Sequence, residues 1–343
     1  MLHSPAVPVI VEMNSPAPAG LLARSAELQS VLSRVRGPLM DALHAAHARN
    51  VHAFGHIAAV AATVSGATLS TLLAQPGVRA VVLDRWVAPS PLFNTQDAQS
   101  QTDVTGTAPI SSVIDAPPTN EPESFGLTSA DVAQANGYNG AAVRVAVIDS
   151  GLDVAEPDLA GAFATDANGV PLRVDFTGTD LRDTLGHGTA CASIIASQGR
   201  VMYTGDTLYN ARDLVPPQIY YSTSPGQSVV YRSHFHLYGM ARGVQLMSAK
   251  IFDTRVPHSG GFESWIVRAI EWAIDHHANV ISESFGGLAV PSNGTDPIAQ
   301  ADEAAIAAGI TVVAAAGNDG PGQTTISSPA DDPNVIAVGA STD

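Results

Sequence analysis

The stretch VRVAVIDSGLDVAEPDL, residues 143–159, determines how the larger part of this chain folds. Residues 143–148 are predominantly apolar, as in a parallel strand that helices cover on both faces. This strand ends on a carboxylate, Asp149, which Ser150 and Gly151 follow at once. Ligands of such sheets bind beyond the carboxyl ends of the strands. Asp149 is therefore a candidate site residue.

Alternating strands and helices surround this stretch. Further apolar runs predict strands over residues 245–251, 278–283, 310–316 and 334–340, and amphipathic patterns predict helices over 262–277 and 296–308. Runs that are apolar on both faces are typical of parallel strands covered by helices on both sides. The predicted fold class of residues 124–343 is therefore α/β, with a doubly wound, mostly parallel sheet.

The first part of the chain has a different pattern. Residues 1–87 contain strand-like runs at 7–13 and 79–87 and a helical pattern over 21–50 that Gly37-Pro38 interrupts. This pattern predicts a small α+β domain. Residues 88–123 are rich in Pro, Ser, Thr, Gln and Asp and predict a linker.

Composition excludes several classes of partner. The 343 residues include 16 basic and 32 acidic side chains, a net charge of −16, which argues against nucleic acid and anionic membranes. No apolar run is long enough for a transmembrane helix, and the first residues lack the pattern of a signal peptide. A single cysteine, Cys191, leaves the redox compartment open, and we expect it to be a small buried core residue.

Polar groups gather at the predicted strand ends. Ser284, Phe285 and Gly286 follow strand 278–283, and Asn318 lies just past strand 310–316. His187 stands between two glycines at the entry to an apolar helix, a position that suits a general base. Taken singly, the aspartate could be a cap, the histidine structural and the asparagine a turn residue. Their joint placement on one rim favours a catalytic site.

Four motifs, VRVAVIDSGLD, GHGTACA, VISESFGG and VVAAAGNDG, resemble those of the subtilisin-like serine proteases over roughly residues 124–343. The resemblance implies that Asp149 orients and stabilises the imidazolium of His187, the general base. It also implies that Asn318 donates to the developing oxyanion. The charge at the strand end would then serve peptide-bond hydrolysis by an Asp-His-Ser triad.

The resemblance also implies a substrate cleft. Ser284, Phe285 and Gly286 would pair with the substrate backbone as an added strand. The specificity pocket would have Ala315, Gly317 and Ala330 in its walls, which weakly favours large apolar side chains. The loop SSPA, residues 327–330, predicts a cis peptide bond between Ser328 and Pro329.

For the whole protein, the resemblance implies a secreted or otherwise extracytoplasmic endopeptidase that acts on polypeptides and needs no cofactor. The resemblance also makes Asp158 a candidate ligand of a structural calcium ion, although the loop that would supply its partner ligands falls where this chain has its long insertion. Residues 1–87 resemble the inhibitory propeptide, a small ferredoxin-like domain, so that the chain would inhibit itself until the 88–123 linker is cut.

The chain departs from the family pattern at two places. The nucleophile motif, Gly-Thr-Ser-x-Ala, is absent from the sequence, and Ser341 follows a strand instead of opening a helix. We expect this sequence to be a zymogen fragment of a longer protease; the alternative is a catalytically inactive homologue that binds or inhibits proteases. Residues 199–238 form an unusually long connection, which either borders the cleft or is a surface excursion. A third hypothesis, a nucleotide-binding protein, is disfavoured because the sequence contains no G-x-G-x-x-G motif and no P-loop.

Overall fold

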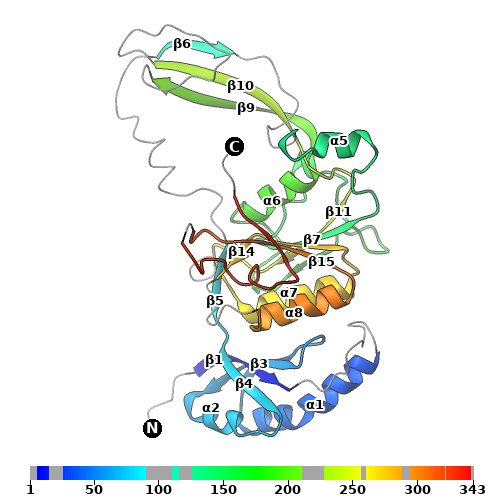
Figure 1. The fold of residues 1–343 in the computed structure, drawn as a ribbon, viewed down its shortest axis with the longest axis vertical. Helices are drawn as coiled ribbons and strands as arrows, with labels where there is room; N and C mark the ends of the chain where they lie inside the picture. Colours follow the sequence, from blue (N-terminus) through cyan, green and yellow to red (C-terminus); the bar gives the residue numbers. More distant parts are fainter. Residues whose placement is uncertain are drawn as a thin grey trace.

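The structure is a computed structural model that describes residues 6–14, 26–89, 110–115, 126–210, 228–255, 260–287, 294–320 and 322–340. The described parts stack as three layers along the longest axis (Figure 1). A small N-terminal domain lies at one end, an α/β domain in the middle and a long β-hairpin at the other end. Within the described residues, no helix is long and apolar enough to cross a membrane.

The N-terminal domain has the βαββαβ order of a ferredoxin-like fold. Its elements are β1 (Ala6–Met13), α1 (Ala26–Ala45), β2 (Arg49–Ala53), β3 (Ala59–Ser65), α2 (Gly66–Leu73) and β4 (Val78–Leu83). The strands form one antiparallel sheet in the order β2-β3-β1-β4. The predicted small α+β domain is therefore present.

The two central strands of this small sheet, β1 and β3, are buried on both faces. Val9 and Val11 of β1 pack with Leu32 of α1 in a core of the domain's own. Ile10 points the other way and joins the core that includes Ile270 of α7 (Glu263–Asp275) and residues of α8 (Pro297–Ala307). Alternation along a strand thus ties the small domain to its neighbour.

Helix α1 corrects one prediction. The helix continues through Gly37 and Pro38, where the sequence suggested an interruption. Leu32 before the proline and Leu39 and Leu43 after it are all buried in the domain core. Packing on both sides of the proline outweighs its local preference for a break.

The middle domain contains a six-stranded sheet in the order β16-β15-β13-β7-β11-β8. Its strands are β7 (Arg144–Asp149), β8 (Arg173–Asp175), β11 (Gln245–Lys250), β13 (Val280–Glu283), β15 (Thr311–Ala315) and β16 (Ile336–Val338), and every pairing is parallel. The five predicted strands are confirmed within a few residues, whereas the short β8 was not predicted.

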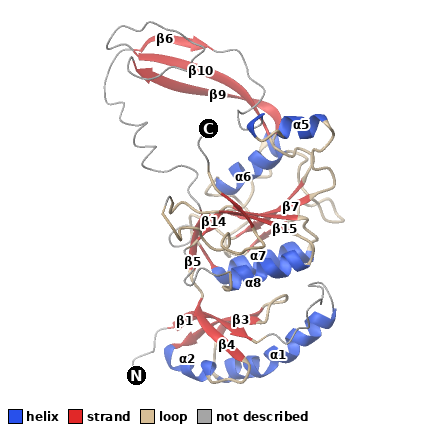
Figure 2. Ribbon diagram, viewed as in Figure 1, coloured by secondary structure: helices blue, strands red, loops and turns tan. Residues whose placement is uncertain are grey.

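Helices cover both faces of this sheet (Figure 2). Ala146 and Ile148 of β7 pack in the core with α7 and α8. Val145 and Val147 face the other way, toward Ala192 and other apolar side chains of α6 (His187–Ala196). This alternation of two apolar faces confirms the doubly wound α/β fold.

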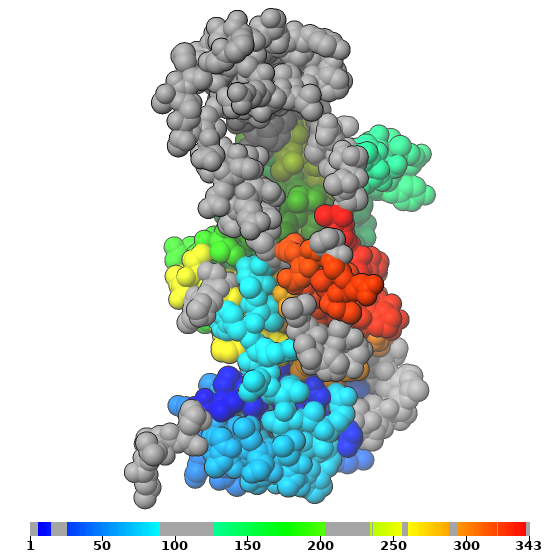
Figure 3. Space-filling model, turned by 60° about the vertical axis from the view of Figure 1, so that its left-hand side comes forward, coloured from blue at the N-terminus to red at the C-terminus, as the bar shows by residue number. Residues whose placement is uncertain are grey.

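The predicted closing strand 79–87 divides in two. It breaks at Asp84 and Arg85, and β5 (Trp86–Pro89) leaves the small sheet. Strand β5 lies antiparallel between two short strands of the middle domain, β12 (Gly261–Phe262) and β14 (Phe285–Gly286). In Figure 3, the cyan segment runs up from the small domain between yellow and orange parts of the middle domain.

The predicted linker, residues 88–123, contains strands in the parts that the structure describes. Besides the end of β5, β6 (Ile110–Asp115) forms a strand that runs parallel to β10 (Ser228–Tyr238). Strand β10 pairs with β9 (Gln198–Asn210), so the predicted insertion 199–238 is largely this hairpin. Residues 90–109, 116–123 and 211–227 of the linker and insertion lie outside the described residues.

Candidate active site

Asp149 and His187 meet at the carboxyl edge of the sheet. Asp149 is the last residue of β7, and His187 is the first residue of α6. The Nδ1 of His187 lies 2.8 Å from both carboxylate oxygens of Asp149, and both residues are buried. Because a carboxylate can only accept, Nδ1 carries the proton and Nε2 is left to exchange one with a reacting group.

The surroundings of His187 favour its protonated form. Burial acts to lower the pKa of His187, but the hydrogen bond and charge of Asp149, with smaller contributions from Cys191, outweigh it and raise this pKa to about 10. Asp149 therefore stabilises the imidazolium, the form that a general base takes after it accepts a proton.

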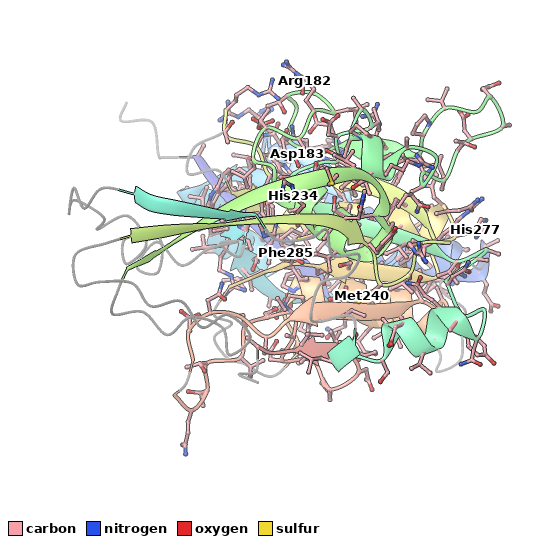
Figure 4. The ribbon with its side chains drawn as sticks, turned by 90° about the horizontal axis from the view of Figure 1, so that it is seen from above. Arg182, Asp183, His234, Met240, His277 and Phe285 are labelled. Atoms are coloured by element: carbon pink, nitrogen blue, oxygen red, sulfur yellow. The ribbon has the colours of Figure 1, made fainter. Side chains whose placement is uncertain are left out.

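A second carboxylate, Asp183, holds this arrangement in place. Its Oδ1 accepts hydrogen bonds from the hydroxyl of Ser150 and the amides of Leu185 and Gly186, and its Oδ2 accepts from both the amide and the hydroxyl of Thr189. Asp183 thus links the loop after β7 to the first turn of α6. Figure 4 labels it beside Arg182.

Sequence reasoning did not identify Asp183. The available signal was an aspartate four residues before His187, just ahead of an apolar helix. The role of Ser150 was also missed: its hydroxyl donates to Asp183 and accepts from the amide of Gly188, while its own amide donates to Asp149.

Glycine is required at position 188 because two segments touch there. A Cβ on Gly188 would collide with the carbonyl oxygen of Gly151 and would lie 3.2 Å from the Cβ of Asp149. The glycine after the histidine therefore lets the helix start approach the strand end closely.

Asn318 lies at the same edge of the sheet. It follows β15, which is separated from β7 only by β13, and all three strands run parallel. The asparagine is exposed, and its neighbour Gly317 has a φ of +100°. The fold thus brings Asp149 and His187 into contact and places Asn318 on their side of the sheet.

The predicted cleft residues converge around Ser327. A Cβ on Gly286 would lie 2.7 Å from the Cβ of Ser327, and one on Gly317 would collide with its hydroxyl. The amide of Ser327 donates to Ala316, next to Ala315, and Ala330 is buried nearby in sequence. The Ser328–Pro329 bond is cis, as predicted.

Ser284 and its neighbours lie where an added strand would pair. Ser284 is half-buried between β13 and β14. Phe285 is paired with Pro89 and Gly286 with Ala88, so the edge predicted to bind substrate carries the chain's own segment β5. Phe285 is itself fully buried, against Phe252 at a ring distance of 5.7 Å.

The surroundings of Asp158 do not fit a calcium ion. Its Oδ1 accepts hydrogen bonds from the amides of Arg200 and Val201. The guanidinium of Arg200 donates to the carbonyls of Pro157 and Ala160, which places a positive charge on the oxygens that a cation would need. The Oδ2 of Asp158 has no hydrogen-bond partner among the described residues and could still accept one. However, no other acidic, histidine or cysteine side chain in the described part of the chain forms a metal-binding cluster with it.

Cys191 lies beside the catalytic candidate pair. It is half-buried, one turn after His187, and its Sγ is 3.8 Å from the Nδ1 of His187. The expectation of a small buried core residue is corrected in that the side chain is only half-buried.

Two further carboxyl groups under this edge were also missed. Glu283 ends β13, and Asp302 faces it from α8; both are fully buried, and their oxygens have no hydrogen-bond partner among the described residues. Burial, with the charge of Asp296, raises the pKa of Glu283 to about 8. Burial and the surrounding acids, Glu283 first among them, raise the pKa of Asp302 well above its ordinary value.

Comparison with known proteins identifies the family. A family model described as "Subtilase family" matches residues 140–343, so the chain belongs to the subtilases. It is 32% identical over 221 residues to subtilisin E of Bacillus subtilis (strain 168), an alignment that covers 64% of this chain and 46% of that protein. Serine protease AprX of the same organism is 32% identical over 210 residues, covering 59% of this chain and 38% of AprX.

The fold also matches a solved structure. The chain resembles fervidolysin from Fervidobacterium pennivorans, described as a keratinolytic enzyme related to subtilisin, with a TM-score of 0.57 and 19% identity. That match covers 97% of this chain and 43% of fervidolysin. The chain thus spans less than half the length of subtilisin E, AprX and fervidolysin.

Proposed function

We propose that this chain provides the general base and the substrate cleft of a serine endopeptidase, and that its N-terminal domain inhibits that site. In this proposal, Asp149 orients His187, His187 removes the proton from a nucleophilic serine, and Asn318 binds the oxyanion. The serine belongs to a part of the protein outside residues 1–343. Polypeptides are the substrates, and residues 88–123 contain the cleavage site that releases the inhibitor.

One observation carries the proposal: β5 fills the cleft as a substrate strand would. It is paired with β12 on one side and β14 on the other. An extended peptide that adds to exposed strand edges gains main-chain hydrogen bonds without regard to its sequence. While β5 stays in this place, no other peptide can use the same edges.

Contacts between the domains support the role of an intramolecular inhibitor. Asp84 caps α7, because its carboxylate accepts from the amide and the hydroxyl of Ser264 at 2.9 and 2.7 Å. In the same helix, Glu271 accepts a hydrogen bond of 2.6 Å from the amide of His56. These contacts dock the small domain on the helix that follows β12.

The test is proteolysis by the protein expressed from its whole reading frame. We expect hydrolysis of a fluorogenic peptide, together with an N-terminus of the active form that lies within residues 88–124. In His187→Ala, both hydrolysis and self-cleavage should vanish. An active enzyme that retains residues 1–123 uncut would contradict the inhibitory role, and unchanged activity in His187→Ala would contradict the catalytic one.

A second candidate is a protein that binds or inhibits another protease. It is favoured by the self-contained core of the N-terminal domain, in which Val9, Leu32 and Val60 pack together. Added to an active subtilisin, the chain would then inhibit it at stoichiometric concentration. Cleavage of the chain without inhibition would exclude this role.

An extracytoplasmic location is part of the same proposal, by similarity to the subtilisins. Fractionation of the producing cells checks it, with a cytoplasmic enzyme as the marker.

A further inference from the structure

The segment that enters the cleft carries a charge, and the cleft carries the opposite one. Arg85 directly precedes β5, and Glu263 directly follows β12, the strand with which β5 pairs. The Nη2 of Arg85 lies 2.6 Å from the Oε1 of Glu263. The main chains are also joined, because the amide of Glu263 donates to the carbonyl of Arg85 at 3.0 Å.

The position of Glu263 is set by the middle domain. As the first residue of α7, it lies between β12 and a helix whose next residues, Ser264 and Ile266, are buried. Its side chain is only 3% exposed, whereas that of Arg85 is 39% exposed. The carboxylate is therefore a fixed part of the cleft wall, and the arginine is the replaceable partner that reaches it from solvent.

Leaving this carboxylate without a cation is costly. Burial raises the pKa of Glu263 and Arg85 opposes that rise, while the charge of Asp296 adds to it. A buried ion that loses its partner is strongly destabilised, because its charge is then neither paired nor solvated. Any polypeptide that replaces β5 in the cleft must therefore bring its own cation or meet this cost.

The pairing register between β5 and β12 determines the position of that cation along the peptide. Gly261 is opposite Val87, so Arg85 lies two residues before the position paired with Gly261. Trp86 lies between Arg85 and Val87 in the sequence. Its ring packs edge-on against Phe262 and Trp265 at ring distances of 4.8 and 5.9 Å, and this packing fixes the register of the segment.

We infer that Glu263 is a specificity-determining residue of the cleft, which selects polypeptides with a basic side chain two residues before the one paired with Gly261. Arginine is the preferred side chain, because its guanidinium can bond the carboxylate while its backbone carbonyl accepts from the amide of Glu263. This inference rests on the proposed function, in which β5 occupies the place of a substrate. It adds a charge requirement to the main-chain pairing and the aromatic contacts that β5 makes with the cleft.

The experiment uses the 1–343 chain with Arg85→Glu, which places like charges together and loosens the resident segment. Dye-labelled peptides with the sequence of residues 84–89, Asp-Arg-Trp-Val-Ala-Pro, and versions with Ala or Glu for Arg, are titrated by fluorescence anisotropy. We expect the Arg peptide to bind at least tenfold more tightly than the Ala peptide, and the Glu peptide more weakly still. Adding Glu263→Gln should bring all three within about threefold, and Glu263→Arg should reverse their order.

Two controls make the outcome decisive. Glu27→Gln, an exposed acid in the first turn of α1, should leave the tenfold preference unchanged. If Arg85→Glu disturbs folding, as judged by circular dichroism, Arg85→Ala takes its place. Equal binding of the Arg and Ala peptides would overturn this inference alone. Binding of no peptide at all would overturn both the inference and the proposed substrate cleft.

Discussion

Asp149 and Glu283 end neighbouring parallel strands, and both carboxyl groups are buried, yet their surroundings differ completely. Asp149 accepts hydrogen bonds from His187 and from the amide of Ser150. Glu283 has no such donor among the described residues, and the nearest helix offers it another acid, Asp302. The same position in the fold thus has hydrogen-bond donors around its carboxylate in one case and none among the described residues in the other.

The contrast shows that the strand end alone does not make a site. At Asp149 the flanking loop and helix supply an amide donor and the imidazole of His187. At Glu283 the carboxyl oxygens have no hydrogen-bond partner among the described residues, and burial with the charge of Asp296 favours the protonated form. Substitutions of the two carboxyl groups should therefore have different consequences.

The largest effect is expected for Asp149→Asn. Without the carboxylate charge, burial dominates and the pKa of His187 should fall from about 10 to its ordinary 6.5 or below. Because the raised pKa stabilises the folded state below pH 6.5 and this contribution disappears as pH rises through 10, the loss in the free energy of unfolding at pH 7 should be roughly 4 kcal/mol. NMR titration of the imidazole measures the pKa, and urea unfolding measures the free energy.

The control for this variant is Cys191→Ala, which removes only the smaller contribution to the pKa of His187. A titration that stays near pH 10 in Asp149→Asn would mean that other groups hold the imidazolium.

The next effect is expected for Glu283→Gln. A carboxyl group with a raised pKa favours the folded state only while it is protonated, so stability should be lost as pH rises from 4.5 through about 8. By pH 9 the unaltered chain should have lost roughly 3–4 kcal/mol through this group, a loss that the variant avoids. Urea unfolding at pH 5 and pH 9 measures the difference between the two chains.

When Asp302→Asn is added to Glu283→Gln, the stability that is still lost between pH 5 and pH 9 should become smaller. Glu27→Gln, at an exposed position, should leave this loss of stability unchanged. Equal stability losses in Glu283→Gln and the unaltered chain between pH 5 and pH 9 would show that Glu283 finds a partner when ionised.

The smallest effect is expected for Asp183→Asn. An amide keeps one acceptor oxygen but replaces the other, so part of the bonding to Ser150 and to Thr189 at the start of α6 is lost. We expect the free energy of unfolding to fall by about 1–2 kcal/mol. The pKa of His187 should stay well above 6.5, because the contact with Asp149 persists. A fall in this pKa as large as in Asp149→Asn would show that Asp183 controls the charge of the pair and does more than hold the helix start.

Local patterns in the sequence were sufficient to predict much of the fold and the pair Asp149 and His187. The apolar runs predicted the strands of the parallel sheet, and the Gly-His-Gly stretch placed His187 at a helix start. Both follow from interactions between residues close in the chain, which leave a period or a motif in the sequence. The same reasoning failed at Pro38, where packing with residues distant in sequence decides the outcome.

Residue types and their spacing along the chain were enough to predict the fold class, the family motifs and the strand-end position of Asp149. Three features became evident only in the folded chain: Asp183 joins the loop after β7 to the start of α6, β5 pairs with β12 beside Glu263, and Glu283 lies near another acid. Each of these depends on side chains that are brought together from separate elements. Their energies come from burial and from the distance between charges, which residue spacing along the chain does not encode.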